Sequence, residues 1–259
     1  MSADLLHQFA AAVAGGAIRT IDLTQTLSED TPVLVLPPEF GQAAGFSRQE
    51  ISRYDDRGVA WYWNNFTVGE HTGTHFDAPV HWVTGQHREA NSLDALPPRD
   101  FVAPAVVIDC SVQAAADPDF LLTVPFLEAW EARHGRIPPR HWILFRTDWS
   151  KREPDAYTNR RDDGAHTPGP DVAACRFLVD ERHAHGFGVE TIGTDAGQAH
   201  RLDPAYPAHS FFHAAGRYGL QCLENLDQLP PTGVVLIAAP LKIRDGSGSP
   251  LRVLALVAG

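Results

Sequence analysis

Residues 71–81 read HTGTHFDAPVH and place four side chains that can bind a metal or carry a proton, His71, His75, Asp77 and His81, within eleven positions. The four residues share one parity, so on a strand they would face the same side. A straight strand rises about 3.3 Å per residue, which would leave His71 and Asp77 about 20 Å apart. Metal donors must instead approach one ion to about 2.0–2.2 Å. The segment must therefore bend if these side chains act together.

Two residues in the segment favour such a bend. Gly73 is a poor helix former that can adopt an unusual dihedral angle, and Pro79 would stop a helix. On that geometry His71, His75 and Asp77 can converge on one ion. Two imidazoles and one carboxylate suit zinc, manganese or iron(II), and three protein ligands leave positions open for water and substrate. Chance histidine pairs are expected among 13 histidines, but four ligand-type residues in eleven positions favour a metal centre.

The elements that must position this segment follow from the hydrophobic pattern. Helices are predicted over residues 4–15, 125–135, 171–188 and 209–217. Strands are predicted over residues 18–27, 58–71, 105–111, 141–150, 189–197, 220–226, 233–243 and 251–259. Residues 151–170 are expected to form an exposed loop, and residues 246–250 a hairpin loop. Strands and helices without strict alternation favour an α/β fold, with residues 1–259 forming one domain around a mixed central sheet with flanking helices.

Composition narrows the range of partners. Of the 259 residues, 44% are hydrophobic and 20% are charged, which is a globular balance. The net charge of −11 argues against nucleic acid and anionic membranes as partners. Three widely spaced cysteines, Cys110, Cys175 and Cys222, suggest free thiols in a reducing compartment. We find no signal peptide and no apolar run long enough to span a membrane, and therefore expect a cytoplasmic protein.

The motif at residues 71–81 resembles the H-x-G-T-H-x-D-x-P-x-H signature of the metal-dependent cyclase family, which includes kynurenine formamidases and isatin hydrolases. Residues 21–33 (IDLTQTLSEDTPV) are similar to the N-terminal strand and loop of that family. Residues 61–65 (WYWNN) and 219–257 are most similar to the isatin-hydrolase-like branch. The resemblance implies a swivelling β/β/α-like fold, a divalent metal cofactor (manganese or zinc) and a homodimer.

The resemblance also implies roles for individual residues. His71, His75 and Asp77 match the metal ligands of the family, and His81 matches its catalytic histidine. A later histidine and a glutamate complete a two-metal site in kynurenine formamidases, and His209 and Glu224 are their expected counterparts. The spacing between these two is about three residues longer than the family pattern, so a second metal stays open. His213 is an alternative to His209, and Gln221 is a further candidate ligand.

Aromatic residues flank the motif on both sides. Trp61 and Trp63 precede it, and Phe76 and Trp82 lie within or beside it. Such side chains can hold a flat aromatic substrate, although each also suits ordinary core packing. Phe40 and Phe46 lie in a segment that is predicted to be a loop and could form a lid.

Together these features predict a hydrolase that cleaves a non-peptide C–N bond in a small aromatic amide or lactam through metal-activated water. His81 is expected to relay a proton, and His209 to share that role or to orient the tetrahedral intermediate. Isatin-type ring opening and N-formylkynurenine deformylation compete as reactions, and the C-terminal segment favours the first. The alternatives are a lactone hydrolase of the same family and a non-catalytic metal-binding or scaffold protein.

Overall fold

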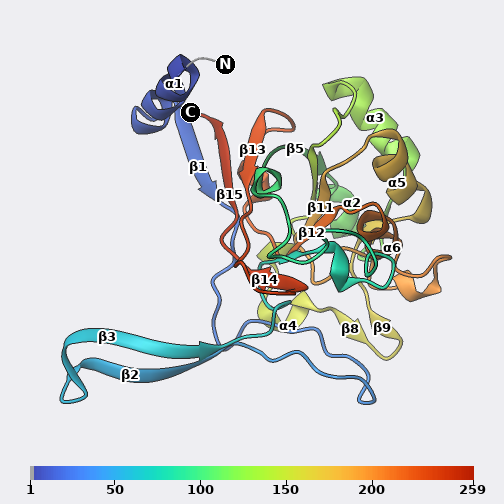
Figure 1. The fold of residues 1–259 in the computed structure, drawn as a ribbon. Coiled ribbons are helices and arrows are strands. Elements are labelled where there is room, and N and C mark those ends of the chain that lie inside the picture. The colour runs from blue at the N-terminus through green and yellow to red at the C-terminus, as the bar shows by residue number, and fades with distance from the viewer. Residues whose placement is uncertain (1–2) are drawn as a thin grey trace.

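The computed structural model describes residues 3–259, apart from the side chains of Ala3 and Asp155. A curled mixed sheet runs through the molecule (Figure 1). Its strands, in spatial order, are β1 (Ile18–Asp22), β15 (Leu254–Ala258), β13 (Val234–Ile237), β5 (Val102–Asp109), β7 (Trp142–Arg146), β11 (Gly186–Val189), β12 (Tyr218–Gln221), β4 (His75–Asp77) and β14 (Gly248–Pro250). Strands β5, β7, β11 and β12 are parallel, and the pairings on either side of them are antiparallel. The prediction of an α/β fold with a mixed central sheet is confirmed.

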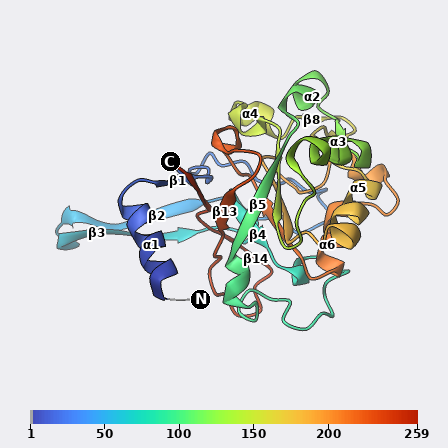
Figure 2. The same cartoon turned by 90° about the horizontal axis from the view of Figure 1, so that it is seen from above.

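The central strands are buried on both faces, as parallel strands usually are. Trp142 and Leu144 of β7 face one hydrophobic core, and Ile143 and Phe145 face the other. Figure 2 shows three helices gathered on one side of the sheet, where they cover the second core: α3 (Val124–His134), α5 (Val172–Arg176) and α6 (Pro207–Ala214). A π-helical turn over Phe177–Glu181 continues α5.

Two elements extend from the body on the opposite side (Figures 1 and 2). One is the N-terminal helix α1 (Ala3–Ala14), and the other is a long hairpin of β2 (Ser47–Asp55) and β3 (Gly58–Thr67). Both carry exposed apolar side chains. The remaining helices and strands are short: α2 (Ser111–Ala116), α4 (Pro154–Tyr157), β6 (Leu121–Leu122), β8 (Arg160–Arg161), β9 (Gly164–Ala165) and β10 (Gly169–Pro170).

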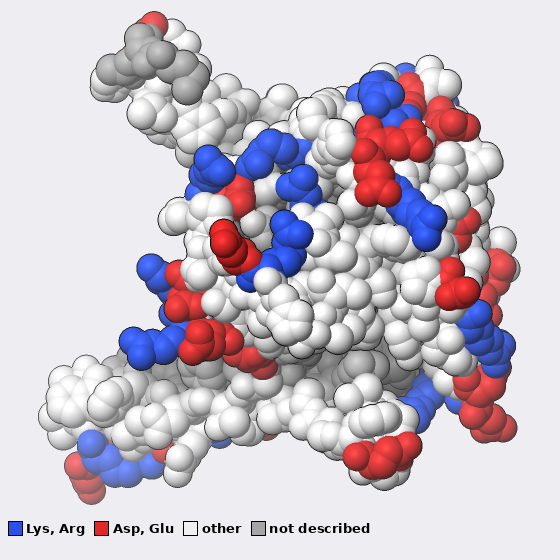
Figure 3. All heavy atoms as spheres, turned by 45° about the vertical axis from the view of Figure 1, so that its right-hand side comes forward, with Lys and Arg blue, Asp and Glu red and all other residues white. Residues whose placement is uncertain are grey.

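The face drawn in Figure 3 carries interspersed basic and acidic side chains around a broad uncharged area. This face therefore offers no extended basic surface. Among residues 3–259, no helix combines the length and the apolar character that a bilayer crossing requires.

The largest error of the sequence prediction lies at residues 171–197. A helix to residue 188 and a strand from residue 189 were expected, but strand β11 occupies Gly186–Val189 and the following residues form turns. Gly186 and Gly188 suggested the end of a helix. They are strand glycines because Gly186 lies directly against the Trp142 ring, and a Cβ on Gly188 would lie 2.9 Å from Leu144.

Three other predicted segments differ from the structure. The strand expected over residues 18–27 ends at Asp22, whose carboxylate accepts a hydrogen bond from the Thr24 amide. The expected hairpin loop at 246–250 contains β14, which pairs with β4. The segment 151–170 is not a fully exposed loop, because Tyr157 and His166 are buried. The pattern also missed β2, which forms the arm with β3.

Candidate active site

The predicted bend lies where the chain enters β4. Gly73 has a φ of 64°, a left-handed angle that glycine adopts readily. Strand β4 then pairs with β12 on one side and with β14 on the other. Because side chains alternate along a strand, His75 and Asp77 face one side of the sheet and Phe76 faces the other. Phe76 is fully buried in the core against Trp142, so its expected contact with substrate is not supported.

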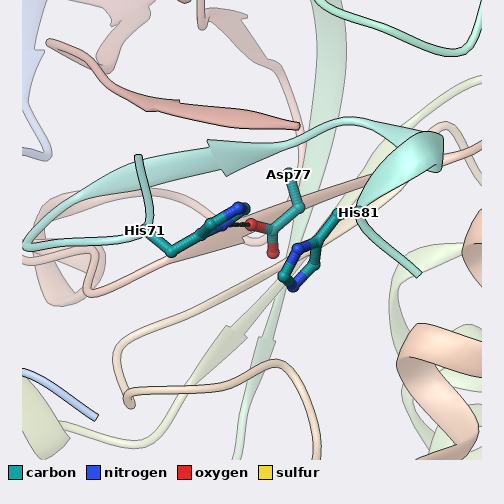
Figure 4. Close-up of side chains that lie close together, drawn as sticks. All are labelled: His71, Asp77 and His81. Atoms are coloured by element: carbon teal, nitrogen blue, oxygen red, sulfur yellow. Dashed lines mark hydrogen bonds and ion pairs between the residues drawn. The ribbon is translucent and has the colours of Figure 1, made fainter. Parts of the chain in front are cut away.

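Asp77 lies at the centre of the site. Its Oδ1 atom is 2.8 Å from Nδ1 of His71 and 3.4 Å from Nε2 of His75. Burial raises the pKa of the Asp77 carboxyl, but the imidazoles of His75 and His71 outweigh burial and hold that pKa well below its usual range. Asp77 is therefore an ionised carboxylate. Figure 4 shows His71, Asp77 and His81 facing one another.

Backbone and side-chain oxygens orient the two nearest imidazoles. Nδ1 of His75 lies 2.7 Å from the carbonyl oxygen of Gly73. Nε2 of His71 lies 2.9 Å from Oγ of Ser247, which itself donates to Glu70 at 2.6 Å. Such partners fix the tautomer of a histidine and direct its other nitrogen, here Nδ1 of His71 and Nε2 of His75, toward Asp77.

The nitrogen and oxygen atoms around Asp77 are arranged as a bound cation would require. Nε2 of His75 is buried and has no hydrogen-bond partner within the described residues, although it lies next to the Asp77 carboxylate. A buried polar atom without a partner is costly. Ligand atoms of His71, Asp77 and His81 lie within 4.8 Å of one another, close enough to hold one ion, and the predicted ligand His75 is outside this group but adjoins the same carboxylate. This pattern fits a divalent metal.

His81 follows β4 in a short 3₁₀ turn over Pro79–His81. Its ring stacks on that of His71 with the centroids 3.9 Å apart. Burial lowers the pKa of His81 to about 3, and the neighbouring imidazoles add to this effect. His81 is therefore a neutral imidazole, which can accept a proton.

Helix α6 supplies a second wall and brings both of the later candidate histidines to the site. Ligand atoms of Asp77, His209 and His213 also lie within 4.8 Å of one another. Nδ1 of His213 is 3.1 Å from the carbonyl oxygen of Arg217. Burial and the neighbouring His209 lower the pKa of His213 to about 4. His209 and His213 therefore occupy the site together.

Asp195 is a site residue that the sequence analysis missed. Its carboxylate lies 2.5 Å from Nδ1 of His209 and accepts hydrogen bonds from the backbone amides of Ala208 and His209. Burial alone would lower the pKa of His209, but Asp195 raises it above the usual value. Asp195 comes from a turn segment that was predicted to be a strand, so no spacing rule connected it to the histidines.

Of the two candidate metal ligands that follow α6, Gln221 and Glu224, only Gln221 reaches the site. Gln221, at the end of β12, donates from Nε2 to Asp77 at 2.6 Å and accepts from the Gly193 amide at 2.7 Å. Glu224 is not part of the cluster. Burial and the nearby Asp22 raise the pKa of Glu224, and its carboxylate lies 3.4 Å from the Asn225 amide. The family resemblance implied Glu224 as a ligand, but the turn after β12 directs it toward Asp22.

Of the three tryptophans predicted to contact substrate, only Trp82 lies beside the imidazoles. Trp82 lies beside the site, with its ring centroid 4.7 Å from that of His209. Trp61 and Trp63 lie half-exposed on the β2–β3 arm and make no contact with the imidazole cluster within this chain. Phe46 stacks on Phe66 at the base of this arm. Phe40 and Phe46 lie outside the helices and strands, as predicted, and their role in a lid stays a prediction.

A buried carboxylate surrounded by imidazoles, at one end of the parallel strands of an α/β sheet, is the arrangement of a metal-dependent hydrolase. The family model described as "Putative cyclase" matches residues 21–196. The chain belongs to this family, and the resemblance inferred from the motif is confirmed.

Three relatives show how far the similarity extends. The chain is 46% identical to an isatin hydrolase of Roseibium aggregatum over 255 residues, which cover 97% of each chain. It is 30% identical to a kynurenine formamidase of Salinibacter ruber, over 77% of this chain and 88% of the relative. The solved structure of isatin hydrolase A from Ralstonia solanacearum superposes with a TM-score of 0.98 at 60% identity, covering 99% of this chain and 98% of that one. These relatives are hydrolases that act on non-peptide C–N bonds.

Proposed function

We propose that this protein hydrolyses the lactam bond of isatin, or of a closely similar aromatic cyclic amide, and opens the ring to a carboxylate. The observation that carries this proposal is the buried Asp77 carboxylate, surrounded by the imidazoles of His71, His75, His81, His209 and His213. The 46% and 60% identity to isatin hydrolases, against 30% to a kynurenine formamidase, supports the lactam as the substrate.

His71, His75 and Asp77 would hold a divalent metal, manganese or zinc, and Gln221 stands beside them as a further ligand or as a partner that orients Asp77. When bound, such a metal lowers the pKa of water toward neutrality and polarises a carbonyl group. Asp77 keeps the site negative, which favours a cation. Ser247 and Gly73 keep the two imidazoles in position.

His81 serves as the proton carrier. Its ring is neutral before the reaction and can take the proton that the water loses as its oxygen forms a bond to the lactam carbon, and the ionised Asp77 favours the protonated ring. The C–N bond then breaks, and His81 returns the proton to the leaving nitrogen. Proton transfer by a positioned side chain is worth about 10²–10⁴-fold in rate.

His209 serves as a donor opposite His81, whose ring centroid is 5.5 Å away. Asp195 favours the protonated form of His209 and binds its Nδ1, which leaves Nε2 as the nitrogen that can donate to a ligand. His209 is thus suited to donate a hydrogen bond to the negative charge that develops on the carbonyl oxygen.

Trp82 forms one side of the substrate space. We propose that the protein is a homodimer and that the β2–β3 arm, with Trp61 and Trp63, extends toward the site of the partner subunit. The half-exposed indoles support this, because large exposed aromatic groups on an extended arm favour an interface.

Three buried free cysteines, Cys110, Cys175 and Cys222, support a reducing, cytoplasmic location for the catalytic domain that spans residues 1–259.

Absorbance assays with isatin, N-formylkynurenine and a simple aryl lactone, each with and without a chelator, test the proposal. Chelator-sensitive opening of isatin, at a kcat/KM well above those of the other two, is expected. A higher kcat/KM on N-formylkynurenine or on the lactone would assign the chain to deformylation or to lactone hydrolysis. Metal binding without turnover of any substrate would favour a scaffold role.

A further inference from the structure

Arg217, in the turn between α6 and β12, is a half-buried cation without a partner. Its Nε atom is buried and unpaired, and its guanidinium group makes no ion pair within residues 3–259. Burial and the guanidinium groups of Arg140 and Arg88 lower its pKa. A partly buried charge that lacks a counter-charge is unfavourable, so a counter-charge at this position would stabilise the folded protein.

The neighbouring charges do not provide it. Asp100 is the nearby carboxylate, but its Oδ1 accepts from Arg140 at 2.7 Å and its Oδ2 accepts from the Tyr218 hydroxyl at 2.8 Å. Arg88 donates to the Ala214 carbonyl at 2.7 Å and lies against Gly216, where a Cβ would come within 2.7 Å of Arg88 Nε. Arg140, Arg88 and Asp100 all act electrostatically on Arg217, so this neighbourhood holds three guanidinium groups and one carboxylate that is already paired.

Further polar atoms in this neighbourhood also lack partners. His185 is 1% exposed, and its Nε2 lies 2.8 Å from the Asp100 carbonyl oxygen, while its Nδ1 is unpaired among the described residues. The indole N–H of Trp142, whose ring centroid is 5.5 Å from that of His185, is unpaired as well. Most buried polar groups in native proteins are hydrogen-bonded, so the unpaired atoms of His185 and Arg217, two residues near Asp100, point to a missing partner.

We propose that Arg217, Arg140 and Arg88 form a binding site for a small oxyanion, namely a sulfate, phosphate or carboxylate group. Guanidinium groups bind such anions through paired N–H donors. The site must bind its anion through direct contacts, because the net charge of −11 repels anions at long range. It is distinct from the metal centre, since none of the three guanidinium groups makes a hydrogen bond or ion pair with Asp77, His71 or His75 among the described residues.

A short path connects this anion site to the active site. The carbonyl oxygen of Arg217 is 3.1 Å from Nδ1 of His213, and β12 runs from Tyr218 to Gln221, which bonds Asp77. An anion that orders the Arg217 side chain would therefore also hold in place the Arg217 carbonyl oxygen that contacts His213.

Thermal unfolding of the metal-loaded protein tests the proposal. Sulfate or acetate is titrated against chloride at constant ionic strength, and calorimetry measures the stoichiometry. Wild type should show a saturable rise in Tm, of about 5 °C at 100-fold excess over Kd, and one binding event. Arg217→Met should lose both effects and, in chloride alone, should be at least as stable as wild type because the unpaired cation is gone.

The matched control is Arg99→Gln, which removes an exposed guanidinium 4.0 Å from the same Asp100. It should respond to the anion as wild type does. Arg88→Gln should weaken binding and provides a second test if Arg217→Met does not fold. A response to acetate alone would identify an organic acid as the source, and a response to sulfate alone would identify a tetrahedral anion. No saturable rise in wild type, or an equal rise in Arg217→Met, would overturn the proposal.

Discussion

Asp195→Asn isolates the carboxylate that orients His209. An asparagine can still accept a hydrogen bond from the Ala208 amide, now 2.6 Å from Asp195. It cannot reproduce the charge-assisted bond to Nδ1 of His209, because its NH₂ group would face the ring N–H. Hydrogen bonds to charged groups contribute about 1.5–3 kcal/mol, and about 1.4 kcal/mol corresponds to a factor of ten in rate. We therefore expect kcat to fall about 10- to 150-fold.

Steady-state kinetics of isatin opening across pH would measure this effect. KM should change little, because the carboxylate does not touch the substrate space. Since Asp195 raises the pKa of His209, its loss should lower that pKa and move the alkaline limb of the kcat profile to lower pH. Asp163→Asn, which weakens a similar Asp–His pair outside the active site, is the control. A kcat within twofold of wild type, with an unmoved pH profile and full metal content, would refute the positioning role of Asp195.

Four further substitutions test other parts of the account. His75→Ala should lose bound metal by elemental analysis, and unchanged stoichiometry would contradict its role as a ligand. His81→Ala should keep the metal and lose about 10²–10⁴-fold in kcat, so full activity would exclude it as the proton carrier. Phe76→Ala should cost about 3–5 kcal/mol in unfolding free energy because it empties a core site; a large change in KM without this loss would restore a substrate contact. His166 lies between two carboxylates, with Asp163 the stronger influence, and its pKa is raised. Its ion pairs therefore stabilise the fold fully below about pH 6.5 and lose this effect as pH rises through the raised pKa. His166→Asn should consequently destabilise the protein more at pH 6 than at pH 9, and equal Tm losses at both would argue against the pairing.

The motif residues could be predicted because chemistry and proximity coincide along the chain. His71, His75, Asp77 and His81 are brought together by one bend, and Gly73 adopts the left-handed angle that the bend requires. The burial of Phe76 could also have been predicted from the sequence. If His75 and Asp77 share one face of a strand, the residue between them must lie on the other.

The remaining site residues are brought together by tertiary packing, which spacing does not encode. Asp195 lies in a turn that follows a glycine-containing strand, and it reaches His209 only because α6 packs over that turn. Ser247 approaches His71 because β14 pairs with β4. Gln221 and Glu224 were both candidate ligands, and they differ because β12 ends at Gln221, five residues before the end of the predicted strand.

Strand β4 has three residues, and each of them is paired on both edges, with β12 and with β14. So short a strand has no stability of its own. His75 and Asp77 therefore cannot be released by the fraying of a surface loop, because their backbone leaves the sheet only when two ladders break at once. The catalytic centre and the sheet form one cooperative unit, and the durability of the site is inherited from the global stability of the protein.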